Sequence, residues 1–304
     1  MMQIVLVGLG AGAAASLLFA SVVSGSLAAV FLFYLAPLPI LIAALGWSHW
    51  AGLIAAAVVA AVIGYLSGLF FISVFVIAFG GWWLAYLALL ARPATNGGGE
   101  ALEWYPVGRL LLWTAVLGSL VVAAAIPNFG TDLETLQTGL RRVYERILRD
   151  PAAVDLLVWA VPPAAGVFST VITVINLYLA ACVVRLSGRL PRPWPDLAAI
   201  TLPTSTLGLL AAALAGSVLP DLPGLFARIF AASLLMAFAF LGYAVLHAVT
   251  RGMDSRFFLL AGAYMASFVI IWLLLAAALL GIAETLFNLR ARATHKRGPP
   301  TLRT

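Results

Sequence analysis

The sequence opens with a long stretch of apolar positions, and no Asp, Glu, Lys or Arg occurs between Ile4 and Ala91. The hydrocarbon core of a bilayer is about 30 Å thick, so roughly 20 helical residues cross it. This stretch is too long for one crossing and must fold back on itself. Its glycine, serine and proline breaks predict four helices, near residues 4–24, 27–46, 50–66 and 69–91.

Proline interrupts several of the apolar runs. Pro37 and Pro39 lie inside the second predicted helix, where each removes a backbone donor, so a kink or break is expected there. A broken helix is tolerated inside a membrane only where protein or a cavity covers the break. The later apolar runs predict helices over residues 110–127, 151–188, 197–219, 225–250 and 257–283, with Pro162 and Pro163 splitting the second of these and Pro203 interrupting the third.

Two polar segments separate these runs. Residues 92–108 contain a glycine run at 97–99 that lacks a following Lys-Ser/Thr, so it predicts a flexible connector rather than a phosphate-binding loop. Residues 131–150 are amphipathic, with Thr131 and Glu134 in a capping-box pattern at the start and Pro151 closing the helix. We expect an interfacial helix on the bundle or the membrane surface, with a lid over a cavity as the alternative.

Composition supports a membrane protein, because 64% of the residues are hydrophobic and only 9% are charged. Soluble domains carry about 25% charged residues. The runs do not alternate as barrel strands do, so the predicted fold is all-α, a polytopic transmembrane helical bundle. We expect about eight or nine spans in one integral membrane domain over residues 1–293, with a front half (1–126), the amphipathic helix (131–150), a back half (152–293) and a basic flexible tail (294–304).

The basic residues favour one orientation. The formal charge of +6 is scattered over helix ends without interleaved aromatic residues, so the lipid bilayer is the expected partner and nucleic acid is not. With a cytoplasmic N-terminus, the loops at 92–109, 185–192 and 251–256 all fall inside, as the positive-inside rule requires. Nine crossings would place the basic tail outside. We therefore expect both termini in the cytoplasm and eight crossings, with one irregular segment that the sequence does not identify.

Five polar residues form the predicted substrate-binding set. Ser169, Thr173 and Asn176 share one face of a helix, and Thr204 and Ser205 follow Pro203. Transporters build sites where broken helices meet polar side chains, so this set predicts a site for a small-molecule ligand. Asn176 has two interpretations, because its amide either bonds a neighbouring helix or lines a polar cavity.

A second face consists of small residues on the first helix: Gly8, Ala11, Gly12 and Ala15. Such faces let helix backbones approach closely in lipid. Packing inside the bundle and docking on a membrane partner subunit are the two interpretations.

Catalytic chemistry has little support in the sequence. The one cysteine, Cys182, has no internal disulfide partner, and the histidines and acids are dispersed, without catalytic or metal-ligand spacing. We therefore expect no catalytic residue, no metal and no cofactor. No charged residue lies in the middle of a clearly predicted span, which argues against ion-coupled transport.

Several motifs together carry a family resemblance. They are the amphipathic midsection and three short segments: Gly8-Leu9-Gly10-Ala11-Gly12-Ala13, Trp104-Tyr105-Pro106-Val107-Gly108-Arg109, and Gly281-x-x-Glu284 with Arg290. Over residues 1–293 the chain resembles the YybS-like family of predicted bacterial membrane proteins, a domain of unknown function. That family is similar at long range to the S components of energy-coupling-factor transporters, which bind a substrate in a helical bundle and dock on a coupling subunit. In S components an Ala-x-x-x-Ala pattern on the first helix makes this contact, and Ala11 and Ala15 match it.

The resemblance implies a multi-pass protein of the bacterial cytoplasmic (inner) membrane that binds a small substrate and docks on a partner. The extra spans and the 131–150 insertion depart from the six-helix S component. Two alternatives remain: a non-catalytic scaffold or assembly factor, which predicts tight packing without a polar cavity, and a membrane enzyme acting on a lipid carrier.

Overall fold

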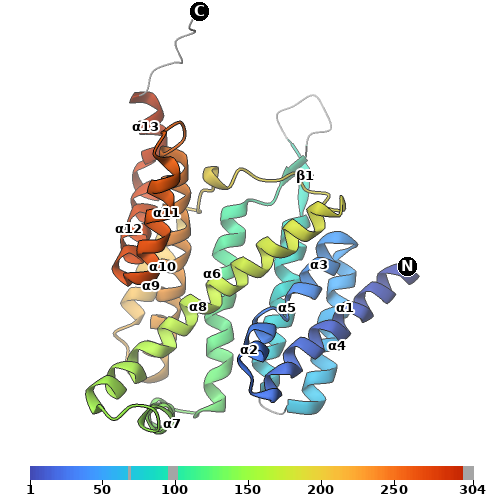
Figure 1. The fold of residues 1–304 in the computed structure, drawn as a ribbon, viewed down its shortest axis with the longest axis vertical. Coiled ribbons are helices and arrows are strands. Elements are labelled where there is room, and N and C mark those ends of the chain that lie inside the picture. The colour runs from blue at the N-terminus through green and yellow to red at the C-terminus, as the bar shows by residue number, and fades with distance from the viewer. Residues whose placement is uncertain (68–69, 95–101, 297–304) are drawn as a thin grey trace, which may run out of the picture.

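The computed structural model describes residues 1–67, 70–94 and 102–296. Apart from one short hairpin, these residues form helices joined by turns and loops (Figure 1). The helices are α1 (Met2–Ala20), α2 (Leu27–Tyr34), α3 (Leu38–Gly46), α4 (His49–Ser67), α5 (Phe70–Leu89), α6 (Val107–Ala125), α7 (Leu133–Glu145), α8 (Pro151–Leu186), α9 (Ser205–Gly216), α10 (Asp221–Val249), α11 (Arg256–Val269), α12 (Ile271–Phe287) and α13 (Leu289–Lys296), with 3-10 turns η1 (Ser21–Ser24), η2 (Ile126–Asn128) and η3 (Leu197–Ala199).

The membrane-type helical fold predicted from the sequence is confirmed. Six apolar helical segments of the described chain are long enough to cross a bilayer, or seven if the bent pair α11–α12 forms one span. The six are Met2–Ser24, Leu27–Gly46, Phe71–Leu89, Val107–Asn128, Pro151–Leu186 and Asp221–Val249. A total of eight or nine spans stays a prediction.

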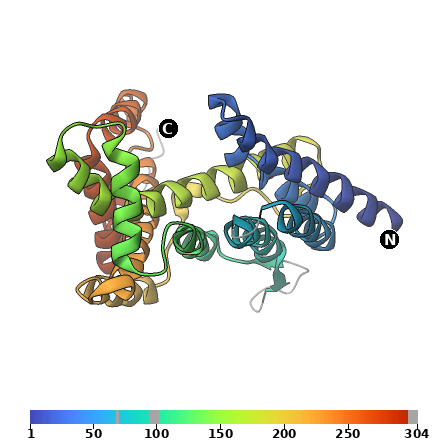
Figure 2. The same cartoon turned by 90° about the horizontal axis from the view of Figure 1, so that it is seen from below.

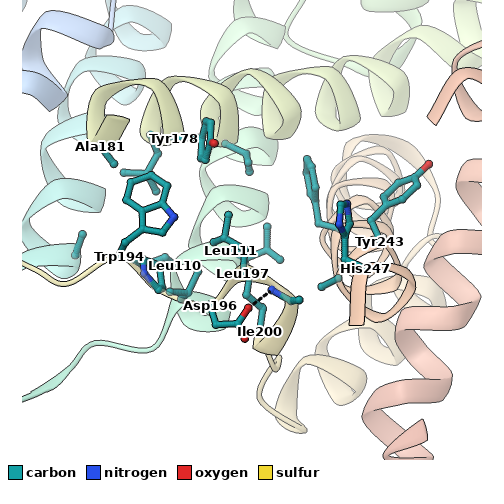
Figure 3. Close-up of a pocket in the computed structure, with 18 of the residues that line it drawn as sticks. Leu110, Leu111, Tyr178, Ala181, Trp194, Asp196, Leu197, Ile200, Tyr243 and His247 are labelled. Atoms are coloured by element: carbon teal, nitrogen blue, oxygen red, sulfur yellow. Dashed lines mark hydrogen bonds between the residues drawn. The ribbon is translucent and has the colours of Figure 1, made fainter. Parts of the chain in front are cut away.

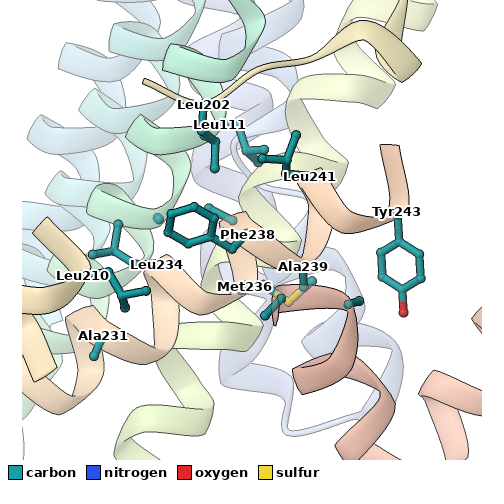
Figure 4. Close-up of a cluster of buried hydrophobic side chains, with 14 of the residues drawn as sticks. Leu111, Leu202, Leu210, Ala231, Leu234, Met236, Phe238, Ala239, Leu241 and Tyr243 are labelled. Atoms are coloured by element: carbon teal, nitrogen blue, oxygen red, sulfur yellow. The ribbon is translucent and has the colours of Figure 1, made fainter. Parts of the chain in front are cut away.

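The helices form two groups joined by α6 and α8 (Figures 1 and 2). Helices α1–α5 lie on one side and α9–α13 on the other. The core of the second group surrounds Phe238, which is fully buried where α10 faces α6 and α9 (Figure 4). Separate apolar clusters fill the space among α1–α5 and between α3, α5, α6 and α8.

The predicted break at Pro37 is confirmed. α2 ends at Tyr34 and α3 begins at Leu38, where the Leu38 amide donates to the Leu35 carbonyl at 3.0 Å. A continuous helix would instead direct that amide to Tyr34, four residues back. The Tyr34 carbonyl is therefore available to a partner outside its own helix.

The predicted split of residues 151–188 is wrong. α8 is one helix of 36 residues with Pro162 and Pro163 inside it. Proline is compatible with helical φ and costs only local bonds, which neighbouring helices can compensate inside a membrane. At about 1.5 Å per residue α8 is about 54 Å long, and it crosses the molecule obliquely (Figure 1).

The amphipathic helix is present as α7, with different ends from those predicted. Its N-cap is Asp132, whose Oδ1 accepts from the Thr135 amide at 2.8 Å, rather than Thr131. It ends at Glu145, and Pro151 opens α8 instead of closing α7, because proline suits a first helical turn. Leu136 is buried against α10, so α7 lies on the lower end of the bundle (Figure 1).

Residues 257–283, predicted as one apolar run, form parts of α11 and α12, which are bent by 119°. Ile270 is extended at the bend, with φ −117° and ψ 99°. The bent pair is thus one irregular segment of the described chain, and the shorter apolar helices at His49–Tyr65 and Ser205–Gly216 are others. No proline or glycine marks the bend, and the packing of α12 on α10 accounts for its position.

Strands β1 (Ala91–Pro93) and β2 (Leu102–Trp104) form an antiparallel hairpin that was not predicted. Arg92 Nε donates to Glu103 Oε2 at 2.8 Å across the pair, and this bond lowers the pKa of Glu103. The glycine run at 97–99 lies outside the described residues. So does most of the predicted flexible tail, whose first residues belong to α13.

Candidate functional site

Two cavities among the described helices bear on function. We call them the lower cavity, which α7 lines, and the upper cavity, which the connection from α8 to α9 lines, because these two segments lie at opposite ends of the molecule (Figure 1). The lower cavity has a volume of about 510 Å³ and lies beside the α2–α3 break, among α5, α6, α7 and α8. Its described lining contains no Asp, Glu, Lys, Arg or His. Leu136, Leu140, Val143 and Tyr144 of α7 contribute to its wall, so the interfacial helix also covers a cavity.

Three of the predicted substrate-binding residues, Ser169, Thr173 and Asn176, line the lower cavity together. Thr173 Oγ1 donates to the Ser169 carbonyl at 2.7 Å. Asn176 Nδ2 donates at 2.9 Å to the Tyr34 carbonyl, which the α2–α3 break leaves available, and at 2.9 Å to the Ile172 carbonyl. Asn176 thus bonds a neighbouring helix and lines a cavity, so both interpretations hold.

Two buried polar atoms at this cavity have no hydrogen-bond partner in the described structure: Asn176 Oδ1 and Ser73 Oγ. An unsatisfied buried polar group costs about 1–3 kcal/mol, so such groups usually have a partner. A bound molecule could provide it. The sequence analysis missed Ser73 because a single serine in an apolar helix gives no signal by itself.

Thr204 and Ser205 lie elsewhere. Thr204 precedes α9 and Ser205 is its first residue, and neither lines the lower or the upper cavity. The expectation that they complete a site with Asn176 is therefore not met. The reason is that residues 200–203 pass the start of α6, and α9 then packs on α10.

The small-residue face of α1 packs inside the bundle. A Cβ at Gly8 would collide with Ile54, and one at Gly12 with Val58, both on α4. Ala15 is fully buried, and Ala11 packs beside the same core. The structure thus shows internal packing for Gly8, Gly12 and Ala15, which are buried, whereas Ala11 is only partly buried.

The upper cavity has a volume of about 810 Å³ and lies between α6, α8 and α10, under the long connection from α8 to α9 (residues 187–204). Its walls are mostly apolar. Figure 3 shows Trp194 and Asp196 on the connection, Tyr178 on α8 and His247 on α10 around the same space. Four charged residues also line it: Arg192, Asp196, Arg251 and Arg256.

Arg290 holds the connection on the side of α12. Its Nη1 and Nη2 donate to the carbonyls of Ala198 and Ile200 at 2.6 and 2.8 Å, and its Nε donates to Glu284 Oε1 at 2.7 Å. Glu284 is 5% exposed, and its Oε2 also accepts from the Arg290 amide. The closing motif of the sequence thus fixes a wall of the upper cavity.

Other contacts hold the connection over the cavity. Gly108, at the start of α6, is so close to Thr201 that a Cβ would collide with its carbonyl oxygen. Arg251 Nη2 donates to both carboxylate oxygens of Asp196, at 2.7 and 2.9 Å. This bond holds the pKa of Asp196 below its ordinary value. The connection is irregular, yet it is fixed along its length.

Arg192 is held at the inner side of the connection. Its Nη1 donates to the Ala88 carbonyl at 3.3 Å, and burial lowers its pKa. A guanidinium nevertheless stays charged in proteins. The sequence analysis assigned Arg192, Arg251 and Arg256 to separate orientation signals, and nothing in their spacing indicates that they meet at one cavity.

Within the described residues, no group of three or more His, Cys, Asp or Glu side chains could hold a metal ion. No protein-family model matches the chain, and no curated protein and no solved structure is significantly similar to it. The residues themselves therefore carry the functional argument.

Proposed function

We propose that this chain is an integral membrane protein of transport-related type that binds a small, uncharged and mainly apolar molecule in the lower cavity. The observation that carries the proposal is that two residues lining one cavity, Asn176 and Ser73, each hold a buried polar atom, Oδ1 and Oγ, without a hydrogen-bond partner among the described residues. Asn176 Oδ1 can only accept a hydrogen bond, whereas the Ser73 hydroxyl can donate or accept. A matching ligand carries an N–H or O–H group and a neighbouring polar atom.

The size and lining of the cavity support an uncharged ligand. Pockets for small molecules usually measure about 300–1,000 Å³ and combine apolar walls with a few polar groups. The lower cavity has about 510 Å³ and this kind of lining. An ion would lose its hydration without gaining an opposite charge, which is strongly unfavourable.

The site also has the construction expected of a transport protein. It lies at a discontinuous helix, where the α2–α3 break leaves the Tyr34 carbonyl available and Asn176 Nδ2 donates a hydrogen bond to it. Transporters commonly place substrates at such breaks. The resemblance to S components adds the bacterial inner membrane and a membrane partner to the proposal, and the positions of the basic loops add two cytoplasmic termini. That partner would need a surface other than the buried residues Gly8, Gly12 and Ala15 of α1.

Native mass spectrometry of gently extracted protein tests this proposal. We expect the wild-type protein to retain a small molecule, and Ser73→Ala to weaken its retention by about two- to tenfold, because one hydrogen bond contributes about 0.5–1.5 kcal/mol. Ser119→Ala is the matched control, since the Ser119 hydroxyl bonds to the Val116 carbonyl and does not line the cavity.

An empty wild-type protein in several mild detergents would contradict the proposal and favour the scaffold alternative. Equal retention by Ser73→Ala and Ser119→Ala would place the molecule elsewhere. Asn176→Leu is a less selective variant, because it also removes the bond to the Tyr34 carbonyl.

A further inference from the structure

The upper cavity differs from the lower one in its charge. We propose that it binds a single-chain amphiphile with an anionic head group, a phosphate or a carboxylate. The head lies at Arg192, Arg251 and Arg256, and the tail lies between α6, α8 and α10. This site shares no lining residue with the lower cavity and does not rest on the function proposed there.

The positive and negative charges that line the upper cavity do not balance. The lining contains three arginines and the single carboxylate of Asp196, which leaves two positive charges if His247 is neutral. Asp196 is already bonded to Arg251. Neither Arg192 nor Arg256 forms an ion pair with any residue that the structure describes. An anion beside Arg192 or Arg256 would therefore neutralise a positive charge without competing with an existing carboxylate.

The position of Arg192 adds to the argument. Its guanidinium is partly buried, and its hydrogen bond to the Ala88 carbonyl is long, at 3.3 Å. A cation removed from water is stable only when an opposite charge or several hydrogen bonds replace the water. Guanidinium groups bind phosphate and carboxylate in a two-pronged geometry, so an anionic head group fits this need well.

The rest of the cavity suits a hydrocarbon chain. Its wall includes Leu110 and Leu111 of α6, Val174 and Leu177 of α8, and Phe240 of α10 (Figure 3 labels the first two). A free inorganic anion would leave this apolar space unfilled. The cavity volume of about 810 Å³ lies within the range for small-molecule pockets, about 300–1,000 Å³.

Amphipathic rings lie among the apolar residues of the wall. Tyr178, Trp194, Tyr264 and His247 line the cavity, and Tyr264 bonds to His247 Nε2 at 2.9 Å. Tyrosine and tryptophan suit an amphiphile because one end of each ring system is apolar and the other is polar. The lining thus combines arginines, amphipathic rings and aliphatic residues, which are the groups that the head, neck and tail of an amphiphile would contact.

The test uses the full chain in a non-ionic detergent and a dodecyl phosphate probe with a photoreactive group near the end of its tail. We expect dodecyl phosphate to compete for labelling, whereas dodecanol competes at least about tenfold more weakly, because it lacks the charge that the guanidinium groups bind. Inorganic phosphate should not compete at millimolar concentration. Labelled peptides should come from α6, α8 and α10.

Two variants test the head-group contacts. Arg192→Gln and Arg256→Gln should each weaken competition by dodecyl phosphate about tenfold or more, as expected for a hydrogen bond to a charged group. Arg92→Gln is the matched control, because it removes one positive charge from the exposed hairpin, away from the cavity lining. Thermal unfolding of each variant in the same detergent shows whether it folds.

Several results would overturn the proposal. Equal competition by dodecanol would remove the role of the anionic head, and equal competition by inorganic phosphate would remove that of the tail. Labelling spread over lipid-facing residues would mean that the cavity is not occupied. If Arg192→Gln and Arg256→Gln both fold and show the same competition by dodecyl phosphate as Arg92→Gln, these two guanidinium groups do not bind the head group. If Arg192→Gln fails to fold, Arg256→Gln and the labelling map still decide.

Discussion

Two glycines determine how closely α10 and α12 approach each other. A Cβ at Gly242 would collide with the Ala277 carbonyl oxygen, and one at Gly281 with the Phe238 carbonyl oxygen. The two backbones are therefore in direct contact, as is typical of helix pairs with small residues in membranes. Gly281 belongs to the closing motif of the sequence, which thus has a packing role as well as the contacts of Glu284.

Gly242→Ala should lower the free energy of unfolding by about 1–3 kcal/mol, because the added methyl group overpacks a backbone contact. Gly262→Ala on α11 is the control: nothing lies near its Cβ position, and alanine in a helix should be neutral or raise that free energy by about 0.5–1 kcal/mol. Unfolding by SDS in mixed micelles measures both. Equal effects of the two variants would contradict the close α10–α12 contact.

At this scale, periodicity predicts which residues share a helix face but not what they meet. The spacing of Ser169, Thr173 and Asn176 correctly placed them together, and they line one cavity. The partner of Asn176 is Tyr34, 142 residues away, and no local pattern indicates it. The same limit explains why Ser73 was missed, and why the sequence did not indicate that Arg192 and Arg256 line the same cavity.

Among the elements, the buried ion pair of Glu284 and Arg290 holds the connection over the upper cavity on the side of α12. The side chains of Glu284 and Arg290 are 6% and 15% exposed, and the chain turns between them through Asn288, with φ 49°. The guanidinium also satisfies the carbonyls of Ala198 and Ile200. The end of α12 and the connection are therefore expected to loosen together.

Glu284→Gln should lower the free energy of unfolding by about 3–5 kcal/mol, because it leaves the charge of Arg290 buried without its counterion. Hydrogen exchange at residues 197–204 should accelerate as well. Glu103→Gln is the control, since its ion pair with Arg92 lies at the surface and should contribute little. If Glu284→Gln is destabilised but hydrogen exchange at residues 197–204 is unchanged, the ion pair does not hold the connection in place.

The ends of most helices could be predicted because charges, glycines and prolines mark them, as at Pro37 and at the start of α6. Where contacts between helices determine whether a helix continues or bends, the sequence pattern predicts the outcome wrongly. Pro162 and Pro163 suggest a break, yet α8 continues through them. Ile270 suggests continuity, yet the chain bends sharply there while α12 follows α10. Both outcomes depend on contacts between helices that are distant in the sequence.

For the whole molecule, the hairpin, the connection, the α10–α11 turn and α13 lie toward one end, while α7 lies at the opposite end (Figure 1). Termini on one side of a membrane require an even number of crossings. A common side for the two termini and a total of eight crossings stay predictions. The hairpin, the connection and the α10–α11 turn contain the basic loops, and their common end is what the positive-inside rule expects.

Single-cysteine labelling in intact cells tests this arrangement on a Cys182→Ser background. Gln3→Cys and Asp254→Cys should both resist a membrane-impermeant thiol reagent, because we propose that their side is cytoplasmic, whereas Thr138→Cys on α7 should react. All three positions are exposed in the structure, so burial does not bias the comparison. Labelling after the cells are opened is the positive control. Opposite results for Gln3→Cys and Asp254→Cys would exclude an even number of crossings between these two residues.

Because α8 is long, its tilt in the membrane depends on the thickness of the bilayer. A helix of about 54 Å in a hydrocarbon layer of about 30 Å must lie at a large angle to the membrane normal. Lipids with longer acyl chains favour a steeper helix, and lipids with shorter chains a flatter one. Because residues of α8 line both cavities, the acyl-chain length of the host membrane would set the width of both at once.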